Sequence, residues 1–277
     1  MPAQHGAIRA SGRVAPCLLI VLAQARADFP LVVAANRDEL YERPAVPMAV
    51  LRDAGPRVVG GRDLLAGGTW LAVNEHGVFA GLTNRPVPTG RDPSRRSRGE
   101  LPLALASHRS AATAVEALGS AYTSSDYNPA WILVGDRESL FAIEVADRPS
   151  FRVQALPAGV HVLENRPLGA VSPKARHVRE LLAGVDGLPV DVLEQRLRAV
   201  LRNHEVPAED DPPSDGTGAG RSPAADAACV HTDSYGTRWS CVVRVPALAA
   251  GRPTVLYAGG APCRVDYRDA TPLWSRP

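Results

Sequence analysis

The sequence predicts a single α+β domain in which helices cover antiparallel sheets. Three observations lead to this prediction: short apolar, β-rich runs near both ends of the chain, helix-like segments between them, and polar hairpin turns inside two of the apolar runs. The chain of 277 residues is 45% hydrophobic and 22% charged, which is typical of a globular protein with one sizeable core. The sequence contains no internal repeat.

The first strands are expected after residues 1–16, a small, polar and basic segment that we interpret as a flexible leader. Apolar runs follow at residues 17–24, 31–36, 57–63, 69–84 and 131–146. Turn residues interrupt the last two runs at Asn74–Gly77 and Gly135–Glu138, so each of these runs is predicted to form a hairpin. Strand, turn and strand return at residues 229–246 and 253–268.

Helices are predicted where apolar residues recur three and four positions apart, at residues 99–118, 172–185 and 189–204. The second of these opens with Ser172 and Pro173, a suitable N-cap and first-turn pair. Residues 206–228 are dense in Pro, Gly, Asp and Ala. We therefore expect a disordered or exposed loop there, inside one domain that spans residues 17–277.

Charge and motif content exclude several classes of function. The 31 basic and 29 acidic side chains give a net charge of +2, too balanced for a general nucleic-acid partner. The four cysteines have no C-x-x-C spacing and are interpreted as reduced thiols. No Cys/His pattern of metal spacing and no phosphate-binding glycine loop occurs, so we expect no metal and no ATP chemistry. No apolar run approaches the about 20 residues of a membrane span, and we expect a cytoplasmic protein.

Four sequence blocks occur in a fixed order: AANRDELYERPA, GGTWLAVNEHGVFAGLTN, Arg98-Gly99 before a Leu-rich helix, and SYGTRWSCVV. In this order they resemble the NRDE family, also called the transport and Golgi organisation protein 2 family. That family is similar to the cysteine-type N-terminal nucleophile (Ntn) hydrolases, which include penicillin V acylase and bile-salt hydrolase. The resemblance implies a four-layer αββα sandwich of two antiparallel sheets flanked by helices.

The resemblance also implies an N-terminal cysteine nucleophile at the start of the first strand, and Cys17 occupies that place. In such enzymes the α-amino group of the same cysteine is the base. An α-amine titrates near pH 8 and lies within reach of its own side chain. Because 16 residues precede Cys17, this chemistry requires cleavage between Pro16 and Cys17. The alternative is that Cys17 is a buried strand thiol.

The polar run Asn36–Glu39 follows a strand that we expect to end beside the start of the Cys17 strand. By the resemblance, Asp38 binds the amine of Cys17, and Arg37 contacts the substrate or the carboxylate. Asn36 and Glu39 are predicted to cap the strand end and the next turn. The alternative is a polar turn with an internal ion pair.

Two asparagines resemble active-site residues of the acylases. Asn84 ends a predicted strand and matches the position that donates an N–H to the oxyanion. Asn165, which follows another predicted strand, matches a second active-site asparagine. Both are also explained as turn residues before a proline.

Three further side chains complete the candidate site. Arg176 matches the acylase arginine near the nucleophile, although Lys174 and Arg179 compete for that place and a solvated helix face explains all three. Trp70 lines the substrate pocket or belongs to the core. Arg238 binds an anionic substrate group or pairs with Asp233, and its block, residues 235–238, has no assigned role.

Two functions of different class follow. The first is an Ntn-type amidohydrolase or acyltransferase that acts on a small amide or acyl substrate and needs no cofactor. The second is a protein that binds or transports haem or an acyl-lipid ligand and has no hydrolytic activity. A purely structural protein is disfavoured because polar residues gather at strand ends, where sites are built.

Overall fold

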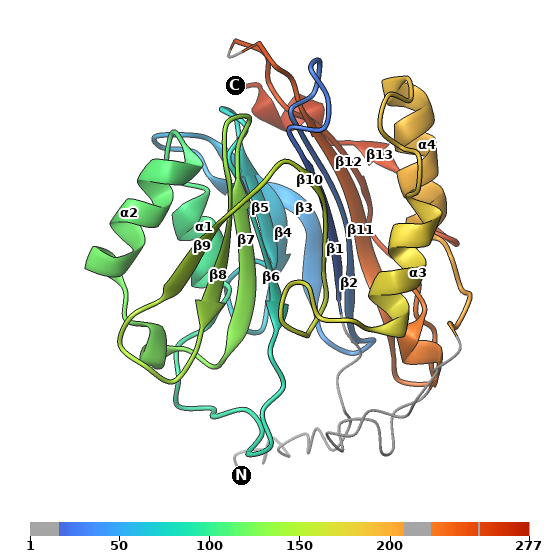
Figure 1. The fold of residues 1–277 in the computed structure, drawn as a ribbon. Coiled ribbons are helices and arrows are strands. Elements are labelled where there is room, and N and C mark those ends of the chain that lie inside the picture. Colours follow the sequence, from blue (N-terminus) through green and yellow to red (C-terminus); the bar gives the residue numbers. More distant parts are fainter. Residues whose placement is uncertain (1–16, 208–222, 249, 277) are drawn as a thin grey trace.

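The computed structural model describes residues 17–207, 223–248 and 250–276. Two antiparallel sheets lie face to face, and helices cover the outer face of each, so the chain forms four layers (Figure 1). The predicted αββα sandwich is therefore confirmed. The leader assigned to residues 1–16 lies outside the described residues.

The first sheet has six strands in the order β10-β1-β2-β11-β12-β13, and the second has seven in the order β3-β4-β5-β6-β7-β8-β9. The strands of the first sheet are β1 (Leu18–Ala23), β2 (Leu31–Leu40), β10 (Gly159–Leu163), β11 (Tyr235–Val245), β12 (Thr254–Ala258) and β13 (Arg268–Asp269). Those of the second are β3 (Ala45–Arg52), β4 (Val58–Asp63), β5 (Leu71–Asn74), β6 (Phe79–Asn84), β7 (Ala130–Gly135), β8 (Leu140–Val145) and β9 (Arg152–Leu156).

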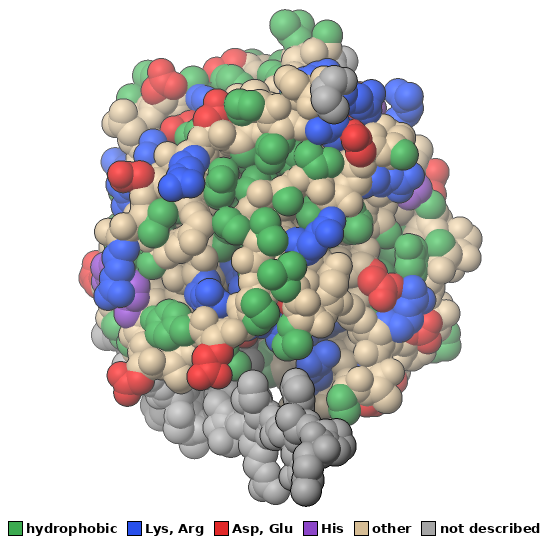
Figure 2. All heavy atoms as spheres, turned by 180° about the vertical axis from the view of Figure 1, so that it is seen from behind, with side chains coloured by type: hydrophobic (Ala, Val, Ile, Leu, Met, Phe, Trp, Pro, Cys, Tyr) green, Lys and Arg blue, Asp and Glu red, His purple; other side chains and the backbone are tan. Residues whose placement is uncertain are grey.

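Four α-helices form the outer layers. Helices α1 (Glu100–Leu105) and α2 (Ala111–Ala121) cover the seven-stranded sheet, while α3 (Pro173–Leu181) and α4 (Val190–Leu201) cover the six-stranded sheet (Figure 1). Short 3₁₀ turns lie at η1 (Ser124–Asp126), η2 (Pro223–Asp226) and η3 (Thr271–Trp274). Over the face seen from behind, basic and acidic side chains are interspersed (Figure 2), in keeping with the small net charge.

The central strands β1 and β2 are buried on both faces. Leu19 and Val21 belong to the core between the two sheets, whereas Leu18 and Ile20 pack toward α3 and α4. A strand buried on both faces needs apolar residues at every position rather than at alternate ones. This explains the continuous apolar runs LLIV and LVVAA.

The local signals for turns and caps are confirmed. Asn74 Oδ1 accepts hydrogen bonds from the backbone N–H groups of His76 and Val78 across the β5–β6 turn. Asp136 does the same for the β7–β8 turn. Ser172 caps α3 by accepting from the N–H of Ala175 at 3.0 Å.

Other predicted boundaries are wrong. The helix predicted over residues 99–118 is two helices, because Ser110 caps a new helix after a break. Strands β3 and β9 were not predicted, and both lie at sheet edges. An edge strand is covered on fewer sides, so its apolar pattern is weak; residues 152–155 of β9 are exposed throughout.

The loop predicted at residues 206–228 falls largely on residues 208–222, outside the described part. Its last residues are not exposed: they form η2, and Ala225, Ala227 and Ala228 are buried. No helix among the described residues is both long and apolar enough to cross a bilayer.

Candidate active site

The polar run Asn36–Glu39 lies inside strand β2, which continues to Leu40. The expectation that the strand ends at this run is therefore wrong. Side chains of a strand alternate between its faces, so Arg37 and Glu39 share the inter-sheet face of Ala35, and Asn36 and Asp38 share the helix-side face of Ala34.

Asn36 and Glu39 do not cap a strand end. Asn36 Nδ2 donates to the carbonyl oxygens of Leu201 at 2.9 Å and Ala228 at 2.8 Å, and so ties β2 to the end of α4. Glu39 forms ion pairs with Arg37 at 3.3 Å and Arg43 at 3.5 Å. The internal ion pair considered as an alternative thus exists, within a strand rather than a turn.

Cys17 directly precedes β1. Since Leu18 pairs with Asn36 and Leu19 with Leu163, the continued registers place Arg37 and Asn165 on either side of Cys17. The Cys17 thiol is half-buried and points toward the Asp38 carbonyl oxygen, 3.7 Å from Sγ. Burial, together with the negative charge of Asp38, raises the pKa of this thiol to about 12.

Asp38 is buried and held by several partners. Its Oδ1 accepts a hydrogen bond from Thr237 Oγ1 at 2.5 Å, and its Oδ2 lies 3.7 Å from Lys174 Nζ. Burial raises the pKa of the Asp38 carboxyl, and the nearby Lys174 charge and the Thr237 hydroxyl only partly oppose this. Among the described atoms, Oδ2 has no hydrogen-bond partner.

The block at residues 235–238 supports this carboxylate. Tyr235 donates its hydroxyl to the Asp38 carbonyl oxygen at 2.6 Å, and Thr237 contacts the carboxylate directly. Gly236 permits close approach, because a Cβ there would lie 2.3 Å from the Tyr41 hydroxyl and 2.6 Å from the Val230 carbonyl oxygen.

Arg238 sits at a β-bulge in β11, where the register shifts between Thr237 and Trp239. Its Nη1 donates to the carbonyl oxygens of Leu40, at 3.1 Å, and Arg43. Arg238 therefore holds the turn after β2. The considered pair with Asp233 is absent from the ion pairs of the described residues, in which Arg238 has none.

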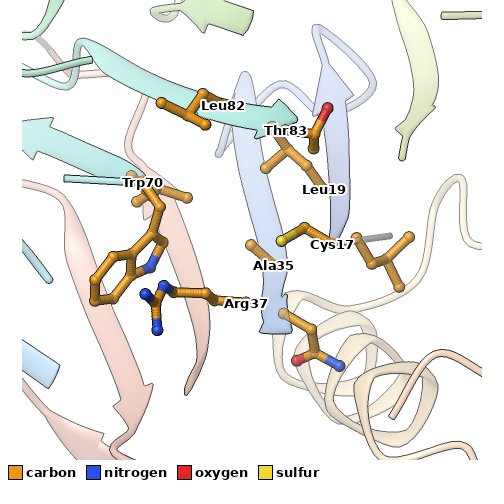
Figure 3. A pocket seen from close by; sticks show the side chains of 11 residues that line it. Cys17, Leu19, Ala35, Arg37, Trp70, Leu82 and Thr83 are labelled. Atoms are coloured by element: carbon orange, nitrogen blue, oxygen red, sulfur yellow. The ribbon is translucent and has the colours of Figure 1, made fainter. Parts of the chain in front are cut away.

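A cavity opens beside Cys17 between the two sheets, with an empty volume of about 260 Å³. It is lined by Cys17, Leu18, Leu19, Ala35, Asn36, Arg37, Trp70, Leu71, Gly81, Leu82 and Thr83. In Figure 3 the Cys17 sulfur points from the start of β1 into this space, and Arg37 extends beneath the Trp70 ring.

Arg37 and Trp70 form one wall of the cavity. The guanidinium lies 4.3 Å from the centre of the indole ring and also pairs with Asp63 at 3.4 Å. Trp70 fits because Gly61 lacks a side chain: a Cβ at Gly61 would lie 1.9 Å from the ring. Trp70 also packs edge-on against Trp239, so it belongs to the core and lines the cavity at once.

The two candidate asparagines differ in their surroundings. Asn84 ends β6, where alternation gives it the face of Ala80, toward α1, while Thr83 lines the cavity. Asn165 lies two residues beyond β10 and is only 6% exposed. Its Nδ2 and Oδ1 are both buried without a hydrogen-bond partner among the described atoms, which is rare for a buried amide.

The cation that the structure brings to Asp38 is Lys174 rather than Arg176. Lys174 is 1% exposed on α3, whereas Arg176 is half-buried on the same helix. Contact with Asp38 was not assigned from the sequence to Lys174 or to the hydroxyls of Tyr235 and Thr237. The alternation of Tyr235 and Thr237 in the 235–238 block could have indicated that both side chains face the same site.

Four residues that suit a metal lie together outside the cavity: His204, Cys229, His231 and Cys263. They come from three separate loops. Their ligand atoms all lie within 4.8 Å of one another. All four cysteines that the structure describes are free thiols.

Comparison with known proteins identifies relatives of this chain. Residues 17–249 match the family described as Transport and Golgi organisation 2. The mouse Transport and Golgi organization 2 homolog is 30% identical over 235 residues, covering 79% of this chain and 83% of the mouse protein. The human homolog is 30% identical over 236 residues, with the same coverage of both chains.

Two solved structures share the fold at low identity. The Caenorhabditis elegans ortholog of N-acylethanolamine-hydrolyzing acid amidase has a TM-score of 0.52 and 14% identity, covering 84% of this chain and 94% of that chain. A variant of the conjugated bile acid hydrolase from Clostridium perfringens has a TM-score of 0.52 and 15% identity, covering 94% of this chain and 95% of that chain.

Proposed function

The chain belongs to the transport and Golgi organisation 2 family, and from that premise we propose that it is an Ntn-type cysteine amidohydrolase or acyltransferase acting on a small amide. One observation carries the proposal. In the strand registers Cys17 lies between Arg37 and Asn165. The Asn165 amide, and Oδ2 of Asp38 next to Arg37, are buried without a hydrogen-bond partner among the described atoms. Buried groups of this kind are costly unless something binds them.

The thiol needs a base. With a pKa of about 12, only about one thiol in 10⁵ is ionised at pH 7. The α-amino group of Cys17, once residues 1–16 are removed, supplies a base that titrates near pH 8. Asp38 Oδ2 lies 3.7 Å from Lys174 Nζ and has no hydrogen-bond partner among the described atoms, so in this proposal it accepts a hydrogen bond from the α-ammonium group.

In this reaction the Cys17 thiol transfers its proton to the α-amine while sulfur attacks the amide carbonyl carbon. The C–N bond breaks, the amine leaves with that proton, and a thioester remains on Cys17. Water then attacks the thioester, loses a proton to the α-amine, and releases the acid and the thiol. An amine or alcohol in place of water gives acyl transfer.

The oxyanion of the tetrahedral intermediate needs N–H donors. We assign this role first to Asn165 Nδ2, because it is buried without a partner in the strand register next to Cys17. Asn84 stays in the proposal only as a second donor, because alternation along β6 turns its side chain toward α1 and it is not part of the cavity lining. Arg176 stays a proposed site residue on α3, but the cation at Asp38 is Lys174, two positions earlier on that helix.

The cavity indicates a small, mainly apolar acyl group. Leu19, Leu71, Leu82 and the Trp70 ring supply its walls, with Arg37 as the one cation in the lining. Arg37 already shares its charge with Glu39 and Asp63. Arg238 is bound to two backbone carbonyls, so we assign substrate contact to Trp70 and Arg37 before Arg238.

Haem, the ligand of the alternative function, does not fit these residues. The described lining offers Cys17 as its one axial ligand and contains no histidine. We therefore assign haem no role in the reaction. In this proposal an acyl-lipid ligand is the acyl part of the amide substrate.

The test compares three proteins: the full chain, a chain that begins Met-Cys17, and the latter with Cys17→Ala. Intact mass and N-terminal sequencing identify the mature first residue of each. Hydrolysis of N-acylethanolamines and of conjugated bile acids, the amide classes named for the structural neighbours, is followed by release of the amine. We expect turnover only when Cys17 is the first residue. Equal turnover by Cys17→Ala contradicts the proposal.

The asparagine roles are tested separately. Asn165→Ala is expected to lower kcat by about 10²–10³-fold, as loss of one oxyanion donor does elsewhere. Asn84→Ala is the matched variant. A larger loss from Asn84→Ala than from Asn165→Ala reverses their assignment, and thermal unfolding of both variants shows whether the fold is intact.

A further inference from the structure

Three loops far apart in the sequence bring two histidines and two cysteines together. His204 follows α4, Cys229 and His231 lie between η2 and β11, and Cys263 lies between β12 and β13. Cys229 is buried, whereas His204 and Cys263 are exposed, so an ion has access from solvent. None of the four lines the cavity beside Cys17.

The distances among Cys229, His231 and Cys263 match three corners of a tetrahedron around one ion, and the His204 ligand atom lies within 4.8 Å of them. Cys229 Sγ lies 3.8 Å from Cys263 Sγ, and His231 Nε2 lies 3.2 Å from Cys263 Sγ and 3.8 Å from Cys229 Sγ. A tetrahedral zinc ion with Zn–S of about 2.3 Å and Zn–N of about 2.0–2.1 Å separates two sulfurs by about 3.8 Å and sulfur from nitrogen by about 3.5 Å.

The outer contacts of the cluster suit metal ligands. His204 Nδ1 lies 3.0 Å from the Cys229 carbonyl oxygen, which fixes that nitrogen as the donor and leaves Nε2 for the ion. A ligating histidine usually donates its other N–H in this way. The loops are also tied by Cys229 N–H to the Asn203 carbonyl, 2.8 Å, and Arg202 Nε to the Pro262 carbonyl, 2.8 Å.

We infer that His204, Cys229, His231 and Cys263 bind one Zn²⁺ ion in a Cys₂His₂ site. On binding, the two thiols release two protons, and the two thiolates balance the charge of the ion. Four-coordinate S₂N₂ sites of this closed type are structural, because no position is left for water or substrate. This reverses the expectation of no zinc that the sequence spacing suggested.

A Cys229–Cys263 disulfide is the competing reading of the same sulfurs. The sulfurs are 3.8 Å apart, whereas a disulfide requires about 2.05 Å. A disulfide also gives no reason for two histidines to converge on the pair. Cobalt binding under reducing conditions distinguishes a metal site from a disulfide.

The zinc site is linked to the candidate active site by a short chain of hydrogen bonds. Val230 lies between two ligands, and its N–H donates to Thr237 Oγ1 at 2.8 Å. The Thr237 N–H returns a hydrogen bond to the Val230 carbonyl at 2.8 Å. The Thr237 hydroxyl in turn donates to Asp38. The metal thus positions Thr237, while its binding is independent of the proposed amide chemistry.

The experiment uses the full chain, purified with reductant, freed of metal with a chelator and titrated with Zn²⁺ or Co²⁺ alone. Native mass and elemental analysis measure stoichiometry, and absorption measures cobalt coordination. We expect one ion per chain, tetrahedral d–d bands and a thiolate-to-cobalt charge-transfer band. Cys263→Ser and His204→Ala, both at exposed positions, should weaken binding by about 100-fold or more, beyond the usual loss of an outer partner.

Cys17→Ala and His161→Ala are the matched controls, since each removes the same side-chain type outside the cluster, and both should bind as the parent does. The inference is overturned by any of these results: no bound ion in the reduced parent, octahedral cobalt bands without charge transfer, or unchanged affinity in Cys263→Ser and His204→Ala. A Cys229–Cys263 disulfide that persists under reductant and blocks cobalt also overturns it. The cobalt spectrum of the parent decides the matter even where a variant fails to fold.

Discussion

Arg37 and Asp38 are neighbours in sequence, but the two faces of β2 treat their charges differently. Arg37 lies on the inter-sheet face in a network with Glu39, Asp63 and Arg43, whose side chains are 13–20% exposed, and its ring partner is Trp70. Asp38 lies on the helix side with Lys174 as its nearest cation, and both side chains are at most 1% exposed.

The two faces of β2 stabilise the charges of Arg37 and Asp38 by different means. On the Arg37 face several partners share the charge and water reaches the network, so removing one partner costs little. On the Asp38 face the carboxylate is buried from water and is held by Lys174 and the Thr237 hydroxyl. Removing either group leaves a buried polar atom unpaired. Four single substitutions test whether the two faces differ in this way.

Lys174→Met should have the largest effect on stability. It leaves the Asp38 carboxylate buried without its cation, which destabilises a protein by about 3–5 kcal/mol. Urea unfolding measures the loss. Arg176→Met, on the same helix but half-buried, is the control and should cost less than about 1 kcal/mol. Adding Asp38→Asn to Lys174→Met should recover part of the lost stability. Equal losses in Lys174→Met, in the double variant and in Arg176→Met would contradict a buried Asp38–Lys174 ion pair.

Thr237→Val keeps the side-chain shape and removes the hydroxyl that Asp38 and Val230 share. Loss of a hydrogen bond to a charged group should cost about 1.5–3 kcal/mol. The exposed Thr123→Val, in extended backbone and without a side-chain cap hydrogen bond, is the control, with an expected change within about 0.5 kcal/mol. Thermal and urea unfolding compare them, and a similar small change in both would mean that Thr237 does not support Asp38.

Gly61→Ala tests the Arg37 face by displacing Trp70, since the new Cβ would meet the ring at 1.9 Å. Overpacking of this kind costs about 1–3 kcal/mol, and Trp fluorescence should shift. Gly119→Ala in α2 is the control, because its Cβ would meet nothing within 4 Å. That change should stabilise by about 0.5–1 kcal/mol. A stabilising Gly61→Ala is incompatible with the cavity wall described above.

Asp63→Asn should have the smallest effect at neutral pH, about 0.5–1 kcal/mol, but it separates the two faces by pH. Burial raises the pKa of Asp63, yet hydrogen bonds from Arg43 and the Ala66 N–H outweigh it and the net pKa is lowered. The folded pKa is below the unfolded one, so this stabilisation is present above about pH 4 and is lost as pH falls through the folded value.

The contribution of Asp38 to stability should change with pH in the opposite direction. Its folded pKa is raised, so its contribution is full below the unfolded pKa of about 4 and is lost as pH rises through the folded value. In Asp63→Asn, the unfolding temperature should therefore depend less on pH than in the parent at the acid end of the pH range. In the Asp38→Asn/Lys174→Met double variant, the unfolding temperature should depend less on pH than in the parent above pH 4. The same change of slope in both would remove the distinction between the faces.

Local signals predicted most strands, the hairpin turns and the helix cap, because apolar runs, the Asn74 turn and the Ser172 cap act over a few residues. The four layers and the place of Cys17 were expected from the resemblance to the family. The edge strands β3 and β9 were not predicted. The end of β2 was also missed, because tertiary pairing with β11 extends β2 through its polar residues to Leu40.

The partners within the site were harder to predict than its strands. Lys174 and Arg176 are two positions apart on a short helix, and only the docking of α3 decides which one reaches Asp38. The Cys/His cluster has no spacing signature for the same reason: three loops contribute to it, and only Cys229 and His231 are close in sequence.

The register of β1 also constrains how this chain tolerates insertions. Strand β1 is hydrogen-bonded along both flanks, to β10 and β2, and Cys17 takes its position from both ladders. One extra residue between Cys17 and Leu19 would carry the thiol to the opposite face of the sheet or slip both ladders. Insertions should therefore be tolerated in the exposed turn around Gly90, between β6 and α1, far better than anywhere in β1, where a length change of one residue moves the sulfur away from its cavity.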